Sequence, residues 1–146
     1  MNSEIKVIKS DGSKVVIDLD KIHKMVEKSC RNITGVSESL VEMNSGLQFY
    51  DGITTQEIQK ILVKSASDLI SLESPNYQFV AARLLLFAVQ KQVFNTKWKD
   101  AEIYPPLKDI VERNVEKGLY TEDLLNDYTD KEYEKLNSYL RHSRDY

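Results

Sequence analysis

Two β-prone runs lie near the start of the chain. Residues 4–9 (EIKVIK) alternate between apolar and polar positions, residues 14–19 (KVVIDL) follow as the second run, and Asp11-Gly12 lies between them. An Asp-Gly pair between two β-prone runs is a strong hairpin signal, because a type I′ turn needs positive φ at both central positions. The pattern predicts a β-hairpin closed by a type I′ turn at Asp11-Gly12.

From Asp20 onward the hydrophobic period changes to that of a helix. Apolar residues recur at positions 22, 25, 26 and 30, and either Asp18 or Asp20 can cap the helix that they define. A second, shorter helix is predicted from an N-cap at Ser37 through Met43, and Gly46 ends it. The first half of the chain therefore combines a small β element with helices.

Two longer helices are predicted next. The stretch "QFYDGI" is typical of a short strand and a turn, and it precedes Thr54 and Glu57, which form a capping box before an amphipathic helix. Pro75 stands at or just before the first turn of the following helix. Because that helix is apolar nearly all round between Phe79 and Val89, we place it at the centre of a helical bundle.

A polar stretch at residues 95–106 separates this part from the rest of the chain. It ends in Pro105-Pro106, and neither proline can continue a helix. Helical patterns follow, first up to Gly118 and then over residues 120–128 and 129–142. The roughly 40 residues at the end are too few for a full core of their own. We therefore predict a compact domain at residues 1–95 and a helical segment at residues 96–146.

Composition excludes several classes of protein. A chain of 146 residues with 41% hydrophobic content can bury a core, and its formal net charge of -3 leaves no broad basic surface for nucleic acid. A single cysteine, Cys30, rules out a disulfide framework and a multi-cysteine zinc site. The start lacks the apolar core of a signal peptide, and no run approaches the roughly 18 apolar residues of a membrane span. We expect a cytoplasmic protein that binds neither nucleic acid nor membranes.

Most catalytic and metal-binding motifs are absent from the sequence. There is no G-x-x-x-x-G-K, no G-x-G-x-x-G and no H-E-x-x-H. His23 and His142 lie far apart without ligand spacing, and Cys30 falls on the apolar stripe of the first helix, where core packing explains it. We therefore expect no catalytic residue and no metal-ligating residue.

Three lysines remain as candidates for binding chemistry. Lys9 ends the first predicted strand and Lys21 opens the first helix, while Lys91 follows a nearly apolar stretch, so its ammonium group must reach the edge of the bundle. Each of them taken alone is typical of an ordinary surface lysine. If the hairpin covers the bundle at that edge, the three ammonium groups converge beside a helix N-terminus and can hold a triphosphate without a P-loop.

Several unusual motifs occur along the chain in a specific order: "VIKSDGS", "IDLDKIHK", "QFYDGITTQEI", "LVKSASDLIS" and "PNYQFVAARLLLF". In this order they resemble the ATP-cone domain at the N-terminus of the large subunit of class I ribonucleotide reductase. The later stretch "LLNDYTDKEYEKLNSYLRHSRDY" resembles the helical segment that leads into the reductase barrel. The resemblance implies a mainly α fold with a small β cap, in which a hairpin and a short third strand cover a four-helix bundle, followed by extra C-terminal helices.

The same resemblance implies an allosteric site for ATP, which switches the reductase on, or dATP, which switches it off, with Mg²⁺ accompanying the triphosphate. Carried over by position, Lys9 and the strand from Val15 to Asp20 would line the nucleotide. Lys21, Lys91 and Thr55 would hold phosphates or the adenine side, and Ile22 and Ile58 would pack on the base. The implied site consists of Lys9, Ser10, Val15, Val16, Ile17, Asp18, Leu19, Asp20, Lys21, Ile22, Thr55, Ile58, Gln59 and Lys91.

Three positions depart from the family pattern. Ser10 stands where an arginine is usual, Val15 where an acidic residue is usual, and Gln59 where a histidine is common. Losing an arginine removes a bidentate phosphate donor. We therefore predict a folded cone that is weakened as a switch.

The resemblance also implies partners, namely the remaining part of the reductase large subunit and the radical-generating small subunit. Reductase chemistry in this family uses a cysteine thiyl radical and a redox-active cysteine pair, which a single cysteine cannot supply. We expect the chain not to reduce ribonucleotides by itself. It would be the N-terminal piece of a split or truncated, phage-like large subunit, or an artificially shortened fragment.

Two alternatives stay open. A cone whose nucleotide site has decayed would act only as a docking module for other reductase subunits. A transcriptional repressor of reductase genes also carries a cone, but there the cone follows a zinc ribbon with paired Cys-x-x-Cys motifs. The single cysteine and the early start of the cone disfavour this second alternative.

Overall fold

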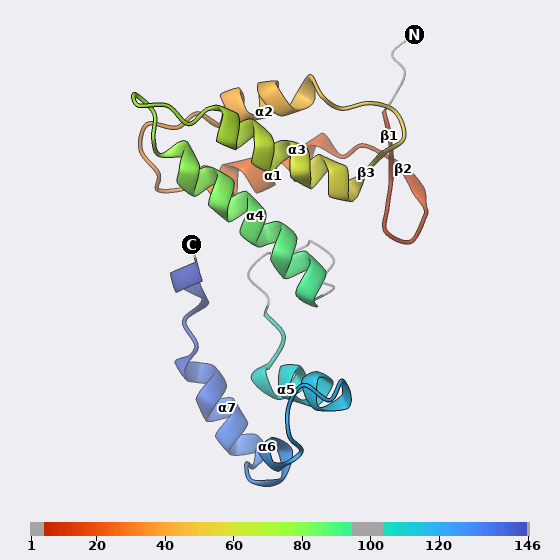
Figure 1. The fold of residues 1–146 in the computed structure, drawn as a ribbon, viewed down its shortest axis with the longest axis vertical. Helices are drawn as coiled ribbons and strands as arrows, with labels where there is room; N and C mark the ends of the chain where they lie inside the picture. The colour runs from red at the N-terminus through yellow and green to blue at the C-terminus, as the bar shows by residue number, and fades with distance from the viewer. Residues whose placement is uncertain (1–4, 95–103, 146) are drawn as a thin grey trace. The chain divides into compact units, whose positions relative to one another are not determined.

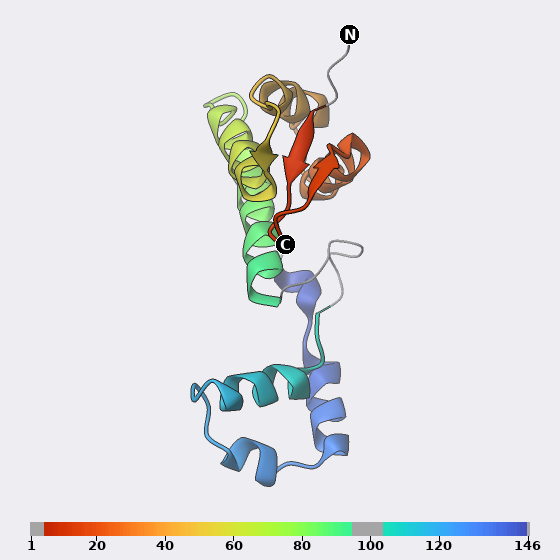
Figure 2. The ribbon, with the colours of Figure 1, turned by 90° about the vertical axis from the view of Figure 1, so that its right-hand side faces the viewer.

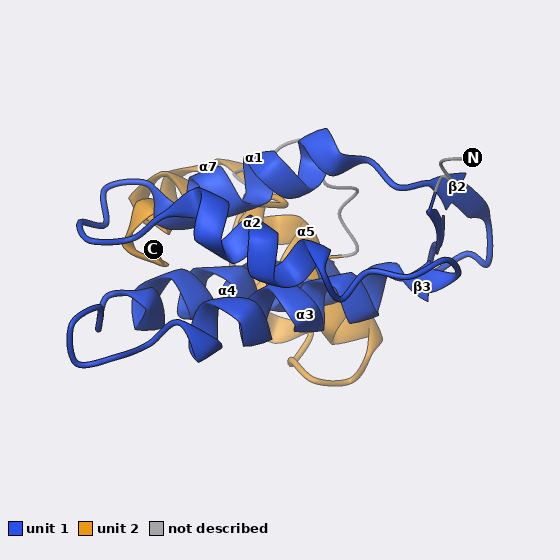
Figure 3. Cartoon of the chain, turned by 90° about the horizontal axis from the view of Figure 1, so that it is seen from above, with its two compact units in different colours: residues 1–93 blue, residues 94–146 orange. Residues whose placement is uncertain are grey.

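The computed structural model describes residues 5–94 and 104–145, and the chain divides into two compact units, Met1–Val93 and Phe94–Tyr146. Figure 1 shows the order of the elements, and Figure 3 distinguishes the two units by colour. The first unit carries a small sheet and the helices α1 to α4. The predicted mainly α fold with a small β cap is confirmed. Most of the predicted polar connection, residues 95–103, lies outside the described residues.

The sheet of the first unit is built around its first strand. Strand β1 (Lys6–Ile8) lies between β2 (Lys14–Val16) and β3 (Ile53–Thr54). It pairs antiparallel with β2 and parallel with β3, so that Val7 stands opposite both a hairpin residue and Ile53. One short strand thus fixes the hairpin to a segment more than forty positions later in the chain.

The hairpin turn differs from the predicted type I′ turn. The Gly12 N–H donates to the Lys9 carbonyl at 2.9 Å, and the Lys9 N–H donates to the Ser13 carbonyl at 2.9 Å. Gly12 has a φ of 80°, whereas Asp11 is not among the residues with positive φ. The loop is therefore a type I turn followed by a left-handed glycine, a common solution for three-residue hairpin loops. The type I′ prediction was wrong because the loop contains Ser10 as well.

Helix α1 (Leu19–Cys30) begins earlier than its hydrophobic pattern indicates. The Asp18 side chain caps it by accepting from the Lys21 N–H at 3.1 Å. The second strand, expected to continue through Asp20, ends at Val16 because the capped helix takes over the following residues. Of the two caps that the sequence allowed, Asp18 is the one used.

The caps of the next two helices agree with the predictions. Helix α2 (Glu38–Gly46) begins after the N-cap Ser37, and helix α3 (Thr55–Asp68) begins after Thr54, which forms the expected capping box with Glu57. Both caps provide side-chain acceptors for backbone N–H groups that have no partner within the helix. Helix α4 (Tyr77–Phe94) completes the bundle.

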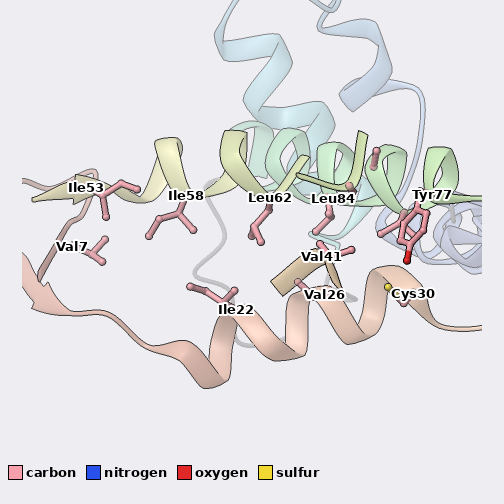
Figure 4. Close-up of a cluster of buried hydrophobic side chains, with 13 residues drawn as sticks. Val7, Ile22, Val26, Cys30, Val41, Ile53, Ile58, Leu62, Tyr77 and Leu84 are labelled. Carbon is pink, nitrogen blue, oxygen red and sulfur yellow. The ribbon is translucent and has the colours of Figure 1, made fainter. Parts of the chain in front are cut away.

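The hydrophobic core of the first unit runs from the sheet through all four helices. Figure 4 shows Val7 and Ile53 at the sheet end and Val26, Val41 and Leu62 farther along the bundle. All of these side chains are at most 4% exposed. Burial of such aliphatic side chains is the main stabilising contribution to a domain of this size.

Helix α4 is not buried all round, which corrects the prediction that it lies at the centre of the bundle. Val80 and Leu84 are buried, but Phe79 and Leu85 are each 53% exposed and Val89 is 46% exposed. The helix packs by one face and leaves a second apolar face uncovered. Composition alone does not distinguish these faces, because both carry aliphatic or aromatic residues.

The second unit is a small helical array. Val111 and Tyr133 are its buried apolar side chains among the described residues. Thr129 and Glu132 form a capping box. Its elements are α5 (Leu107–Glu116), α6 (Asp123–Asn126), α7 (Asp130–Tyr139) and a 3₁₀ turn (His142–Asp145). No helix in the described parts of either unit is long and apolar enough to cross a membrane.

Candidate functional site

The sheet brings three of the predicted site segments to one end of the first unit. Because β1 is paired on both sides, the hairpin that carries Lys9 lies beside the start of α3, whose first residue is Thr55 (Figure 2). The chain then enters α1 directly after the hairpin, so Lys21 in the first turn of α1 belongs to the same end. The hairpin and the start of α3, which are distant in sequence, meet here through the backbone pairing of β1 with β3.

Lys91 comes from a fourth segment, the last turn of α4. This helix runs alongside α3 from the loop that joins them back toward the end that carries the sheet (Figures 1 and 3). Burial lowers the pKa of the half-buried Lys91 ammonium group. No ion-pair partner for Lys91 is found in the described part of the chain. A partly desolvated cation without a partner is a good contact for an anionic ligand.

The apolar residues of the predicted site line the end of the core. Ile22 and Ile58 project toward one another from α1 and α3 (Figure 4), and they are only 9% and 7% exposed. Val15 and Ile17 pack against the same cluster, whereas Val16 is 49% exposed. The isoleucines therefore form a floor that is already largely covered by protein.

Both helix N-termini at this end already hold a carboxylate. Asp18 caps α1, and Glu57 accepts from the Thr54 N–H at 2.9 Å and from the Tyr50 hydroxyl at 3.1 Å. These hydrogen bonds lower the pKa of each carboxyl group, through Lys21 at Asp18 and through Thr54 at Glu57. Because each positive helix end is occupied by an anion, a bound phosphate would depend on lysine side chains rather than on helix dipoles.

The hairpin turn carries a carboxylate, that of Asp11. Asp11 Oδ1 accepts from the Ser13 hydroxyl at 2.6 Å and from the Ser13 N–H at 2.9 Å. These bonds and the nearby charge of Lys9 lower the pKa of the Asp11 carboxyl. The sequence indicated only a turn at Asp11 and only a helix cap at Glu57. The position of Asp11, two residues after Lys9, was the signal from which the interaction between these two charges could have been predicted.

Ser10 and Gln59, two of the three positions that depart from the family pattern, differ in how far they are exposed to solvent. Ser10 lies exposed in the hairpin loop, so an arginine there would have room to extend. Gln59 lies in α3, where its buried Nε2 finds no hydrogen-bond acceptor in the described part of the chain. A buried amide donor without a partner is rare in folded proteins.

The sequence that folds into this three-stranded cap and four-helix bundle matches a known family. Residues 5–92 match the ATP cone domain family, and the chain belongs to it. Over 99% of its length the chain is 41% identical to "Ribonucleoside-diphosphate reductase 1 subunit alpha" of Escherichia coli K12 and of Salmonella typhimurium LT2. It is 39% identical to the "Ribonucleoside-diphosphate reductase subunit alpha" of Haemophilus influenzae.

The matched part of these relatives is their N-terminal part, and the chain spans 18% of their length. The resemblance to the cone of the reductase large subunit is therefore confirmed.

Proposed function

We propose that this chain is an allosteric regulatory domain of ribonucleoside-diphosphate reductase, the enzyme that makes deoxyribonucleotides for DNA synthesis, and that its effector is ATP or dATP. The observation that carries the proposal is the meeting of the hairpin, the start of α1 and the start of α3 in a chain whose residues 5–92 match the ATP cone. Lys9 and Lys21 both lie at this end.

The chemistry of this end suits a nucleoside triphosphate. Lys9, Lys21 and Lys91 would contact the phosphates, because ammonium groups form charge-assisted hydrogen bonds with phosphate oxygens. Mg²⁺ accompanying the triphosphate would neutralise charge that three lysines leave over. The base would lie on the edge of the floor formed by Ile22 and Ile58, with Thr55 beside it.

A ligand bound here would tie the hairpin to the helices, which gives the domain a way to respond to it. Such a ligand shifts a conformational equilibrium only by its difference in affinity for the two states. ATP and dATP differ in one ribose hydroxyl, so opposite effects require contacts sensitive to that group. The partners that would read the shift are the remaining part of the large subunit and the radical-generating small subunit.

Calorimetric titration of the chain with ATP and with dATP tests the proposal, with UTP as the control for base recognition. A ligand that binds only the folded state stabilises it by about 2.7 kcal/mol at a hundredfold excess over Kd, so thermal unfolding gives an independent readout. Absence of both heat and thermal stabilisation at millimolar nucleotide would remove the binding proposal and leave the family assignment intact.

A second candidate function is that of a docking module for other reductase subunits. The exposed apolar face of α4 favours it, with Phe79, Leu85 and Val89 each at least 46% exposed. A contiguous apolar face of this kind is typical of a contact surface. Unchanged thermal unfolding in ATP, together with co-elution with the rest of a reductase large subunit, would favour docking over nucleotide binding.

A further inference from the structure

The N-cap of α1 binds one of the lysines of the proposed nucleotide site. Asp18 Oδ1 accepts from the backbone N–H of Lys21 at 3.1 Å, and Asp18 Oδ2 lies 2.8 Å from Lys21 Nζ. Both oxygens of one carboxylate are thus engaged by the same residue. The Lys21 ammonium group therefore already has an anion beside it.

We infer that Asp18 is an internal competitor for the nucleotide: its carboxylate holds Lys21, and a phosphate must displace it before Lys21 can bind the ligand. This inference rests on the proposed function and concerns the regulation of the same site. Asp18 would lower the affinity of the chain for triphosphates by holding the ammonium group of Lys21.

The geometry explains why Asp18 cannot simply move away. Its Oδ1 caps α1, and losing an N-cap destabilises a helix. Once Lys21 turns to a phosphate, the carboxylate stays at the helix end without its cation and close to added negative charge. Like charges at such distances repel, and the repulsion is weakened but not abolished by solvent.

Lys21 is the lysine of the proposed site that is held in this way. Lys9 lies near the charge of Asp11 but forms no ion pair in the described part of the chain. Lys91 also forms no ion pair there. The hydrogen bonds from Lys21 also lower the pKa of the Asp18 carboxyl, so the carboxylate is ionised at neutral pH. The competing anion is therefore present under physiological conditions.

The variant Asp18→Asn tests the inference with little risk to the fold, because asparagine caps helices as well as aspartate does. The matched control is Asp68→Asn, which breaks the Lys64–Asp68 pair at the far end of α3 and changes the net charge by the same amount. The two pairs have similar exposure, with side chains 63% and 45% exposed for Lys21–Asp18 and 65% and 52% for Lys64–Asp68.

Titration with ATP at constant ionic strength gives the result. We expect Asp18→Asn to tighten ATP binding about fivefold, the factor that corresponds to the attraction between two unit charges about 4 Å apart in water, here Asp18 and Lys21. Asp68→Asn should change ATP binding less than about twofold. If the parent binds ATP and Asp18→Asn binds it equally or more weakly, the inference is overturned while the proposed function stands. If neither binds, both fall. Binding by the variant alone would support the inference directly.

A double-mutant cycle separates competition for Lys21 from a general effect of charge. In a Lys21→Ala background the carboxylate has no ammonium group to hold, so Asp18→Asn should then tighten ATP binding less than in the parent. An equal gain in both backgrounds would show that Asp18 acts by its charge alone, and the inference would fail. Circular dichroism of all variants checks that each remains folded.

Discussion

Replacing Lys91 by methionine should stabilise the chain and weaken its nucleotide binding at the same time. The Lys91 ammonium group is half-buried, burial lowers its pKa, and no ion-pair partner lies among the described residues. Methionine keeps most of the length and apolar surface of lysine without the charge. The substitution therefore removes an unfavourable desolvation in the free chain and, in the proposed complex, a phosphate contact.

The two effects have different expected sizes. Because the side chain is only half-buried, solvent screening limits the gain in unfolding free energy to about 0.5–1 kcal/mol, or roughly 2–8 °C in Tm for a unit of this size. Loss of a charge-assisted contact with phosphate costs about 1.5–3 kcal/mol, which is tenfold or more in Kd. Affinity should therefore fall more than stability rises.

The burial of the Lys91 ammonium group should also make the stability of the chain depend on pH. Since the pKa of Lys91 is lowered on folding, the unfolded chain keeps its proton to higher pH than the folded chain does. Stability should rise with pH between the lowered pKa and the usual value of 10.5. Lys91→Met should lack this rise.

Thermal unfolding with and without ATP measures both effects. The matched control is Lys64→Met on α3, where the lysine side chain is 65% exposed and its ammonium group is paired with Asp68. This control should neither raise Tm nor change ATP binding. A lower Tm for Lys91→Met with unchanged circular dichroism would refute the argument from desolvation. ATP binding equal to that of the parent would refute the placement of the phosphates beside Lys91.

Three further predictions concern single sites. Lys9→Ala should weaken ATP binding about tenfold and Ser10→Arg should tighten it by adding a forked donor, as the same titration would measure; equal binding by both variants would contradict the placement of phosphates at the hairpin. A hydrogen bond with Glu42 raises the pKa of His23 above 6.5. The pair therefore stabilises the fold fully below pH 6.5, and this contribution is lost as pH rises through the raised pKa. Urea unfolding of the parent and of Glu42→Gln at pH values on both sides of the raised pKa should show this loss of stability only in the parent. Burial raises the pKa of the Cys30 thiol to about 11, so a thiol reagent should label it only in denaturant, and fast labelling of the folded chain would contradict its burial.

The helix caps and the order of the elements could be predicted from the sequence, because both depend on residues that lie only a few positions apart in the chain. Ser37, Thr54 and Glu57 act as their local spacing predicts. The turn at Gly12 was assigned to the right place but the wrong type, because the length of a hairpin loop is set by the register of the paired strands. The predicted end of the second strand, at Asp20, was also wrong, because Asp18 caps α1 and the strand ends before it, at Val16.

The composition and spacing of residues along the chain thus determined the helices, their caps, the hairpin and, through motif order, the family. Only the tertiary structure decided that β1 pairs with β3, which face of α4 is exposed, and that Lys91 is half-buried without an ion-pair partner among the described residues. The physical reason is range. Capping and periodicity act within one or two turns of a helix, whereas strand pairing, burial and charge pairing depend on which distant segments the folded chain brings into contact.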